Sequence, residues 1–203
     1  MVTNEATAKG NPSRAYALAL PNLLTYARML AVPAVVACLY VEGHVGNWLA
    51  LAVFVLASIT DFFDGYLARA WQQQSALGRM LDPIADKLLV AASLMMLVAE
   101  GTISAWSLLA AIVILSREVL VSGLREFLAE LQVSVPVSHL SKWKTTVQMV
   151  AVGFRLAGPA GDVVLPGTTL VGLTLLWISA ILTIYTGWDY FRAALRHAIG
   201  EDS

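Results

Sequence analysis

Six long apolar stretches divide this chain, and they constrain its fold more than any other feature of the sequence. A helix needs about 20 apolar residues to cross a bilayer, because every backbone amide and carbonyl must find a partner within the segment. The stretches cover residues 21–41, 47–70, 83–99, 104–130, 141–157 and 168–194. The sequence therefore predicts an all-α integral membrane protein with six transmembrane helices.

The chain carries too few charges for a soluble domain of its length. Only 13 of its 203 residues are Lys or Arg and 14 are Asp or Glu, while 58% are hydrophobic. A soluble domain carries about 25% charged residues, so much of this surface must face lipid. The formal net charge of −1 also provides no basic field for nucleic acid, and we expect no nucleic-acid partner.

The basic residues outside the predicted helices lie on one side. Lys and Arg occur before the first stretch, around the second and fourth connections and after the last stretch. The connections at 42–46, 100–104 and 158–167 contain none. By the positive-inside rule, both termini and the basic connections are expected in the cytoplasm.

The predicted domain organisation is simple. Residues 1–19 form a cytoplasmic tail or surface segment, 20–196 the six-helix membrane domain, and 197–203 a C-terminal tail. Residues 1–19 lack the apolar core of a cleavable signal peptide, so we expect the first helix to be retained. The chain length and the absence of a targeting extension favour a bacterial inner membrane.

Four aspartates interrupt the apolar stretches near the cytoplasmic side. Asp61 and Asp64 are three residues apart and Asp82 and Asp86 four apart, so each pair shares one face of a helix. Ionisable groups in membrane helices are costly and functional by default. Four carboxylates in a poorly hydrated site repel one another, and a hard divalent cation with oxygen ligands relieves that repulsion. We therefore predict a site for Mg²⁺ or Mn²⁺.

Two small residues accompany the first acidic pair. Gly65 and Ala68 remove side-chain bulk from the face that carries the aspartates. They could leave room for a ligand group against the backbone, or they could let two helices pack closely, as small residues commonly do in membrane proteins. The residues alone leave both interpretations open.

Together these residues resemble a known signature. The pattern Asp61-x2-Asp64-Gly65-x2-Ala68-Arg69-x8-Gly78-x3-Asp82-x3-Asp86 is similar to that of the CDP-alcohol phosphatidyltransferases, with no departure at any fixed position. Enzymes of this family transfer a phosphatidyl group from a CDP-linked lipid to an alcohol and release CMP. The resemblance implies a transferase of phospholipid biosynthesis whose partners are CDP-diacylglycerol and membrane lipids. It also implies a homodimer, which is common in the family.

The resemblance further implies a role for each residue of the signature. Two Mg²⁺ or Mn²⁺ ions would be ligated by Asp61, Asp64 and Asp82. Asp86 would be the catalytic base on the acceptor hydroxyl and would also touch metal. The CDP-lipid would be bound by Gly65, Ala68, Arg69 and Gly78.

A polar stripe marks the first predicted helix. Asn22, Thr25 and Arg28 recur every three residues on an otherwise apolar helix. The segment resembles one that borders the nucleotide site in the family, which implies that these side chains bind the CDP-lipid. Alternatively, Arg28 reaches toward the lipid headgroups.

Basic residues in the fourth and fifth stretches point to a phosphorylated acceptor. Arg117 and Arg125 lie eight residues apart, and Lys142 and Lys144 open the fifth stretch. Guanidinium and ammonium groups both suit phosphate. The alternatives are an ion-pair network between the arginines and their neighbouring glutamates, and a basic flank of the fifth helix.

The sequence around these residues resembles one branch of the family. The strings Arg-Glu-x3-Ser-Gly-Leu-Arg-Glu from Arg117 and Lys-Trp-Lys-Thr-x2-Gln-Met from Lys142 are similar to those of enzymes whose acceptor is sn-glycerol 3-phosphate. They imply that Arg117, Arg125, Lys142 and Lys144 bind the acceptor phosphate. An inositol-phosphate acceptor would need a similar basic cluster, and a small membrane transporter would also carry ionisable residues in its helices.

Overall fold

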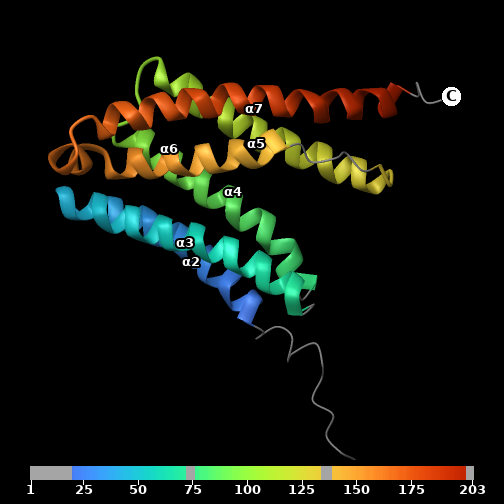
Figure 1. The fold of residues 1–203 in the computed structure, drawn as a ribbon, viewed down its shortest axis with the longest axis horizontal. Helices are drawn as coiled ribbons and strands as arrows, with labels where there is room; N and C mark the ends of the chain where they lie inside the picture. The colour runs from blue at the N-terminus through green and yellow to red at the C-terminus, as the bar shows by residue number, and fades with distance from the viewer. Residues whose placement is uncertain (1–19, 72–75, 134–138, 200–203) are drawn as a thin grey trace, which may run out of the picture.

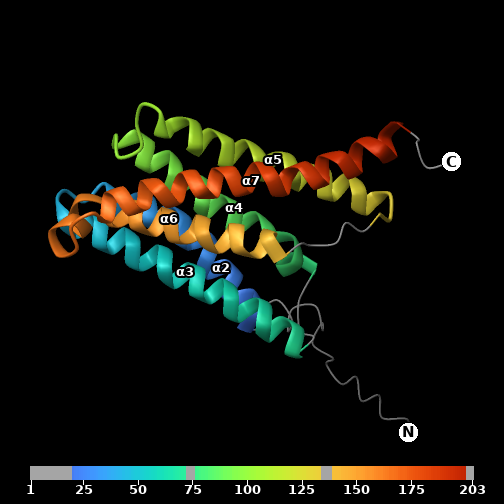
Figure 2. The same cartoon turned by 45° about the horizontal axis from the view of Figure 1, so that its top comes forward.

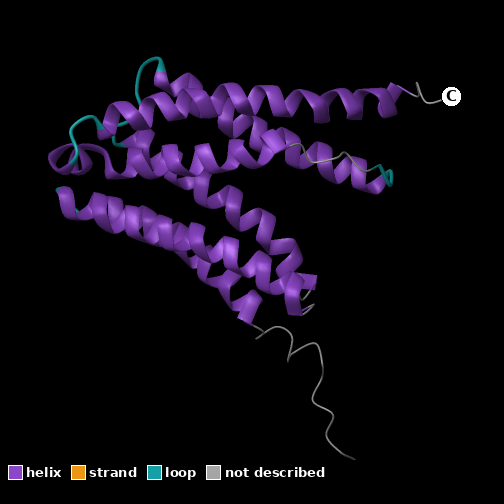
Figure 3. Ribbon diagram, viewed as in Figure 1, coloured by secondary structure: helices purple, strands orange, loops and turns teal. Residues whose placement is uncertain are grey.

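The computed structural model of this chain describes residues 20–71, 76–133 and 139–199. The described residues form helices and connecting turns and contain no strand (Figure 3). Their helices are α2 (Leu20–Leu39), α3 (His44–Trp71), α4 (Ala76–Ala99), α5 (Ser107–Glu130), α6 (His139–Val164) and α7 (Thr168–Ile199). The predicted all-α class is confirmed for this part of the chain.

The helices form a bundle of two halves that are joined through α6. α2 packs against α3 and α4, while α7 packs against α5 and α6. The halves meet where α6 lies against α3 and α4 (Figure 1), and α4 also contacts α5. The turned view shows that α2, α4 and α6 begin, and α3, α5 and α7 end, at the same end of the bundle (Figure 2). This arrangement brings the acidic residues of α3 and α4 to the end from which α6 starts.

The interior of the bundle is apolar, and so is much of its outer surface. Side chains such as Leu89, Leu94, Leu97 and Ile114 are almost completely buried. Large apolar side chains are also exposed on the outside, among them Leu30, Met95, Val119 and Ile181. A monomeric soluble protein rarely exposes so many large apolar side chains, whereas helices in a bilayer present them to lipid.

Four of these helices contain a segment long and apolar enough to cross a membrane. The segments are Asn22–Leu39, His44–Asp61, Ser107–Glu130 and Thr168–Arg196, in α2, α3, α5 and α7. α4 and α6 carry charged side chains in their first halves, including Asp82, Asp86 and Lys144. The structure thus supports a helical membrane protein, with four candidate spans rather than the predicted six among the described residues.

Two helix boundaries differ from the predictions. α4 begins at Ala76 and contains Pro83, which was expected to open it. Membrane helices tolerate an internal proline, because neighbouring groups can satisfy the backbone atoms that it frees. α6 continues past the expected break at Gly158, where a left-handed φ of 45° produces a kink. Asn47 Nδ2 donates a hydrogen bond of 3.1 Å to the Leu156 carbonyl beside this kink and so satisfies a backbone acceptor there.

Candidate active site

The polar stripe of α2 is buried. Asn22 is 0% exposed, and Thr25 and Arg28 are each 1% exposed. A side chain that extended to the lipid headgroups would be exposed at its charged end. The burial of Arg28 therefore favours a role inside the bundle over a role at the headgroups.

Arg28 lies between two of the four aspartates. Its Nη1 atom is 2.7 Å from Asp61 Oδ1 on α3 and 2.7 Å from Asp86 Oδ1 on α4. The arginine is buried, whereas each carboxylate side chain is 37% exposed. One cation thus draws the acidic parts of α3 and α4 together and leaves both carboxylates accessible to a ligand.

Asp82 has a separate partner on the same stripe. The Thr25 hydroxyl donates a hydrogen bond to Asp82 Oδ1. Gly78, Asp82 and Asp86 are four residues apart, so they follow one face of α4, and Gly78 is buried. α2 therefore contacts the acidic face of α4 at two levels, through Thr25 and through Arg28.

Part of the signature has side chains that the structure does not describe. The backbone of α3 continues through it, but nothing is described for the side chains of Asp64, Gly65, Ala68 and Arg69. Over the described side chains, no set of three or more Asp, Glu, His or Cys is gathered closely enough to hold a metal ion. Asp61 and Asp86 nevertheless lie side by side on one guanidinium and offer only oxygen donors, which is the ligand chemistry of Mg²⁺ and Mn²⁺.

A second cluster of charges surrounds a cavity between α4, α5 and α6. The cavity has a volume of about 390 Å³, and its charged lining residues are Asp86, Lys87, Arg117, Glu118, Arg125, Glu126 and Lys144. Asp61, Asp82 and Asp86 form an acidic cluster against Thr25 and Arg28 of α2. Because Asp86 belongs to this cluster and also lines the cavity, the cavity adjoins the acidic cluster. Among the described residues that line the cavity, four cations face three carboxylates, which leaves positive surface for an anionic ligand.

Glu118 pairs with two of these cations. Its Oε1 atom accepts hydrogen bonds from Lys144 Nζ on α6 and from Arg117 Nη1, the latter at 3.3 Å. Part of the predicted ion-pair alternative is therefore present in the structure. One carboxylate shared by two cations does not neutralise both of them, so the pairing is compatible with phosphate binding. The side chain of Lys142 lies outside the described residues.

α7 fixes the two arginines of this cavity. Thr186 Oγ1 accepts a hydrogen bond of 3.2 Å from Arg117 Nη2, and the Tyr190 hydroxyl accepts one of 3.2 Å from Arg125 Nη2. The Arg125 guanidinium also lies 5.4 Å from the centre of the Tyr190 ring, within cation–π range. Gly187 makes room for Arg117, because a Cβ at Gly187 would lie 3.1 Å from Arg117 Cγ.

Sequence reasoning missed two polar residues that line the cavity. Lys87 has the sequence context of a basic helix flank, but its Nζ atom donates a hydrogen bond to Ser122 Oγ on α5. Gln148 is 3% exposed and follows Lys144 by four residues on α6. That four-residue spacing places Gln148 on the face that carries Lys144 and is the signal that could have identified it.

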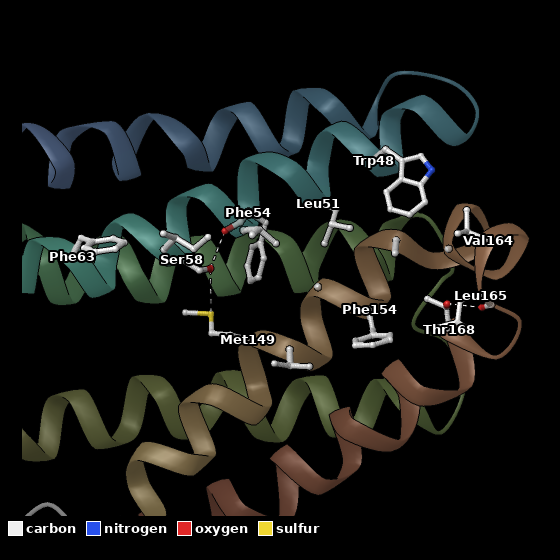
Figure 4. Close-up of a pocket in the computed structure, with 16 residues that line it drawn as sticks. Trp48, Leu51, Phe54, Ser58, Phe63, Met149, Phe154, Val164, Leu165 and Thr168 are labelled. Carbon is white, nitrogen blue, oxygen red and sulfur yellow. Dashed lines mark hydrogen bonds between the residues drawn. The ribbon is translucent and has the colours of Figure 1, made fainter.

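An apolar groove of about 690 Å³ lies between α3 and α6 (Figure 4). Phe63, two residues after Asp61, lies at one end, and Trp48 and Leu165 lie at the other (Figure 4). Met149 lines both this groove and the charged cavity. The groove therefore starts near the acidic cluster and follows the helices away from it.

The acidic cluster, the adjoining basic cavity and the helical membrane fold define a class of enzyme. A family model described as CDP-alcohol phosphatidyltransferase matches residues 18–185. The chain belongs to the CDP-alcohol phosphatidyltransferase family, and the resemblance of its signature is confirmed.

Individual relatives are similar to this chain over most of its length. It is 47% identical to a protein of Rickettsia bellii, over 88% of this chain and 96% of the relative. It is 43% identical to one of Cereibacter sphaeroides, over 90% and 98%, and 41% identical to one of Shigella flexneri, over 86% and 94%. All three relatives are named CDP-diacylglycerol–glycerol-3-phosphate 3-phosphatidyltransferase.

Proposed function

We propose that this protein transfers the phosphatidyl group of CDP-diacylglycerol to sn-glycerol 3-phosphate and releases phosphatidylglycerophosphate and CMP. The observation that carries the proposal is the position of Asp86, which belongs both to the acidic cluster and to the cavity with four cations. A base next to a cationic pocket suits an acceptor that is at once an alcohol and a phosphate. The names of relatives at 41% and 47% identity support the same acceptor.

The proposed reaction is a displacement at the phosphorus of the phosphatidyl group. Asp86 accepts the proton of the acceptor's primary hydroxyl, whose oxygen forms a bond to that phosphorus. The bond from this phosphorus to the bridging oxygen of the diphosphate breaks, and CMP leaves with the electron pair. The acceptor phosphate is held by Lys87, Arg117, Arg125, Lys142 and Lys144, and α7 keeps the two arginines in place.

Divalent metal is part of the proposal. The acidic cluster offers carboxylates only, and Asp61 and Asp86 lie together on Arg28, so the residues fit Mg²⁺ or Mn²⁺. Asp61, Asp64, Asp82 and Asp86 would hold two ions, which when bound would neutralise the charge of the diphosphate. The remaining residues proposed to border the CDP-lipid are Asn22, Thr25, Arg28, Gly65, Ala68, Arg69 and Gly78.

The apolar groove between α3 and α6 is proposed to take an acyl chain of the lipid substrate. Its lining is apolar over most of its length, and Phe63 at its start lies near the acidic cluster that would hold the diphosphate. An acyl chain in this groove would bury apolar surface against the protein. The lipid would then run from the acidic cluster toward Trp48.

We propose that all six helices cross a bacterial inner membrane as one domain over residues 20–196, with both termini and the site on the cytoplasmic side. Asp82 and Asp86 of α4 and Lys144 of α6 face partners inside the bundle, so these charges need not contact lipid. The one-sided distribution of Lys and Arg supports the orientation. A homodimer is proposed on the basis of family membership.

Incorporation of a radiolabelled acceptor tests the proposed function. The purified full-length protein with CDP-diacylglycerol and Mg²⁺ is expected to convert labelled sn-glycerol 3-phosphate into a labelled lipid and to release CMP. Inositol phosphate and unphosphorylated glycerol serve as competing acceptors. Preferential labelling from inositol phosphate would reassign the acceptor within the family, and no labelled lipid from any acceptor would overturn the proposal.

Lys144→Ala is expected to raise the KM for sn-glycerol 3-phosphate about ten-fold, because a charge-assisted hydrogen bond to the acceptor phosphate is lost. The KM for CDP-diacylglycerol is expected to stay within about two-fold. Steady-state assays in which each substrate is varied in turn measure both values. Arg196→Ala, at an exposed position on α7, is the matched control. Equal changes in both KM values would assign Lys144 a structural role instead.

A further inference from the structure

Two polar atoms among the residues that line the charged cavity have no partner in the part of the chain that the structure describes. Arg117 Nε is a donor and Gln148 Oε1 is an acceptor, and neither has a hydrogen-bond partner among the described residues, although both are buried. Both side chains line the cavity that Asp86 borders. Buried polar groups are nearly always hydrogen-bonded, so this unmatched pair calls for a physical explanation.

The terminal nitrogens of Arg117 each have a partner. Nη1 donates to Glu118 Oε1 at 3.3 Å, and Nη2 donates to Thr186 Oγ1 at 3.2 Å. These contacts anchor the guanidinium, and each terminal nitrogen keeps a second N–H for an anionic ligand. Nε lies beside α7, where a Cβ at Gly187 would be 3.5 Å from it, so Gln148 Oε1 is the atom that a ligand in the cavity would satisfy.

Gln148 and Arg117 lie in the inner part of the cavity. Gln148 follows Lys144 on α6 by four residues, which places it about 6 Å further from the end of the bundle where α6 begins. On α5, which runs the opposite way, Arg117 lies eight residues before Arg125 and so about 12 Å further from that same end. Arg125 therefore marks the outer part, while the Lys144 ammonium group reaches Glu118 Oε1 beside Arg117. A phosphate oxygen has no proton to donate to the Gln148 carbonyl oxygen, so it suits these cations better than Gln148 Oε1.

We propose that Gln148 binds the secondary hydroxyl of the glycerol acceptor. A hydroxyl donates one hydrogen bond, and Gln148 Oε1 can accept it. The acceptor phosphate then lies with the cations of the cavity, and the primary hydroxyl is left for Asp86. This role rests on the proposed function and adds the second acceptor group that the cavity recognises.

A packing role does not account for Gln148. An apolar side chain of similar size would fill the same space without leaving a buried carbonyl oxygen unpaired. The terminal torsion of Gln is soft, so the amide can turn its oxygen toward a ligand that enters the cavity. A site that hydrogen-bonds a substrate hydroxyl discriminates strongly against an analogue that lacks it, because the buried groups then stay unpaired.

The test compares two acceptors on the full-length protein and its Gln148→Leu variant. The second acceptor is 3-hydroxypropyl phosphate, which keeps the phosphate and the primary hydroxyl but lacks the secondary hydroxyl. For the unsubstituted protein, kcat/KM is expected to be about 100-fold higher with sn-glycerol 3-phosphate. In Gln148→Leu this preference is expected to fall to about five-fold, because activity on glycerol 3-phosphate drops while activity on the analogue is kept.

The analogue is the internal control, because a structural defect would lower activity on both acceptors alike. An unchanged preference in Gln148→Leu, or no preference in the unsubstituted protein, would overturn the role of Gln148. If Gln148→Leu does not fold, the unbranched Gln148→Met variant is measured against the same two acceptors with the same criteria. An unsubstituted protein that uses neither acceptor would overturn the proposed function as well, and this result differs from a lost preference.

Discussion

The Asp86→Asn variant is expected to lose kcat by about 1,000-fold while it still binds CDP-diacylglycerol. Asn has nearly the shape of Asp but cannot take the proton of the acceptor hydroxyl. Asp86 borders the acceptor cavity and lies 2.7 Å from Arg28. Asp61 keeps its own contact with Arg28 in the variant, so the packing of α2 against α3 should persist. The measurements are kcat at saturating substrates and equilibrium binding of the lipid.

An exposed aspartate provides the matched control for this substitution. Asp189 lies on the surface of α7, so Asp189→Asn should turn over at the rate of the unsubstituted protein. A kcat of Asp86→Asn within about ten-fold of that rate would contradict the role of Asp86 as the base. Loss of lipid binding in Asp86→Asn would show that the proposed metal contact of Asp86, and not only its role as the base, is needed to hold the diphosphate.

Relations within one helix could be predicted from the sequence. Three-residue spacing puts Asn22, Thr25 and Arg28 on one stripe, and four-residue spacing puts Asp82 and Asp86 on one face. These relations depend only on the pitch of an α-helix, which is the same in every protein. The structure places the stripe and that face in contact, through Thr25 with Asp82 and through Arg28 with Asp86.

Relations between helices could not be predicted in the same way. The pairing of Arg28 with both Asp61 and Asp86 depends on the packing of α2 against α3 and α4. Lys87 reaches Ser122 only because α4 lies against α5. Gln148 Oε1 has no partner among the described residues, and this is likewise a property of its surroundings, since no local spacing shows whether a partner is present.

In the proposed six-span topology, hydropathy underestimates helices that carry a functional face. α4 and α6 contain no segment with the composition of a membrane span, and both carry charged residues of the cavity, among them Asp86 and Lys144. The same charges have partners within the bundle, such as Glu118 for Lys144. A helix with one polar face turned to a site can therefore lie in a membrane while a window average counts against it.

The net charge of −1 conceals two clusters of opposite sign. Asp61, Asp82 and Asp86 form the acidic one, and the cavity with Lys87, Arg117, Arg125 and Lys144 forms the basic one. In the proposed reaction, two anionic substrates must approach each other against their mutual repulsion. Separate counter-charges reduce that repulsion, with metal for the diphosphate and basic side chains for the acceptor phosphate. Asp86 belongs to both clusters and so lies where the two substrates would meet.

Removal of divalent metal is expected to abolish turnover, with a loss greater than about 100-fold. Arg28 brings a single positive charge to a cluster that includes Asp61 and Asp86, so it cannot also balance a bound diphosphate. The measurement is activity in excess EDTA, followed by addition of Mg²⁺ or Mn²⁺ beyond the chelator. Activity should return with either ion, because both are hard cations that take oxygen ligands.

The acidic cluster can be tied to this metal requirement through Asp61. Asp61→Asn removes one negative ligand and should raise the Mg²⁺ concentration for half-maximal activity on the order of ten-fold, whereas Asp189→Asn should leave it unchanged. An unshifted Mg²⁺ requirement in Asp61→Asn would remove Asp61 from the metal ligands. Full activity in EDTA would contradict metal dependence altogether. The charge of the diphosphate would then have to be balanced by Arg28 and the cavity cations, because these are the positive groups that the described residues place beside Asp86.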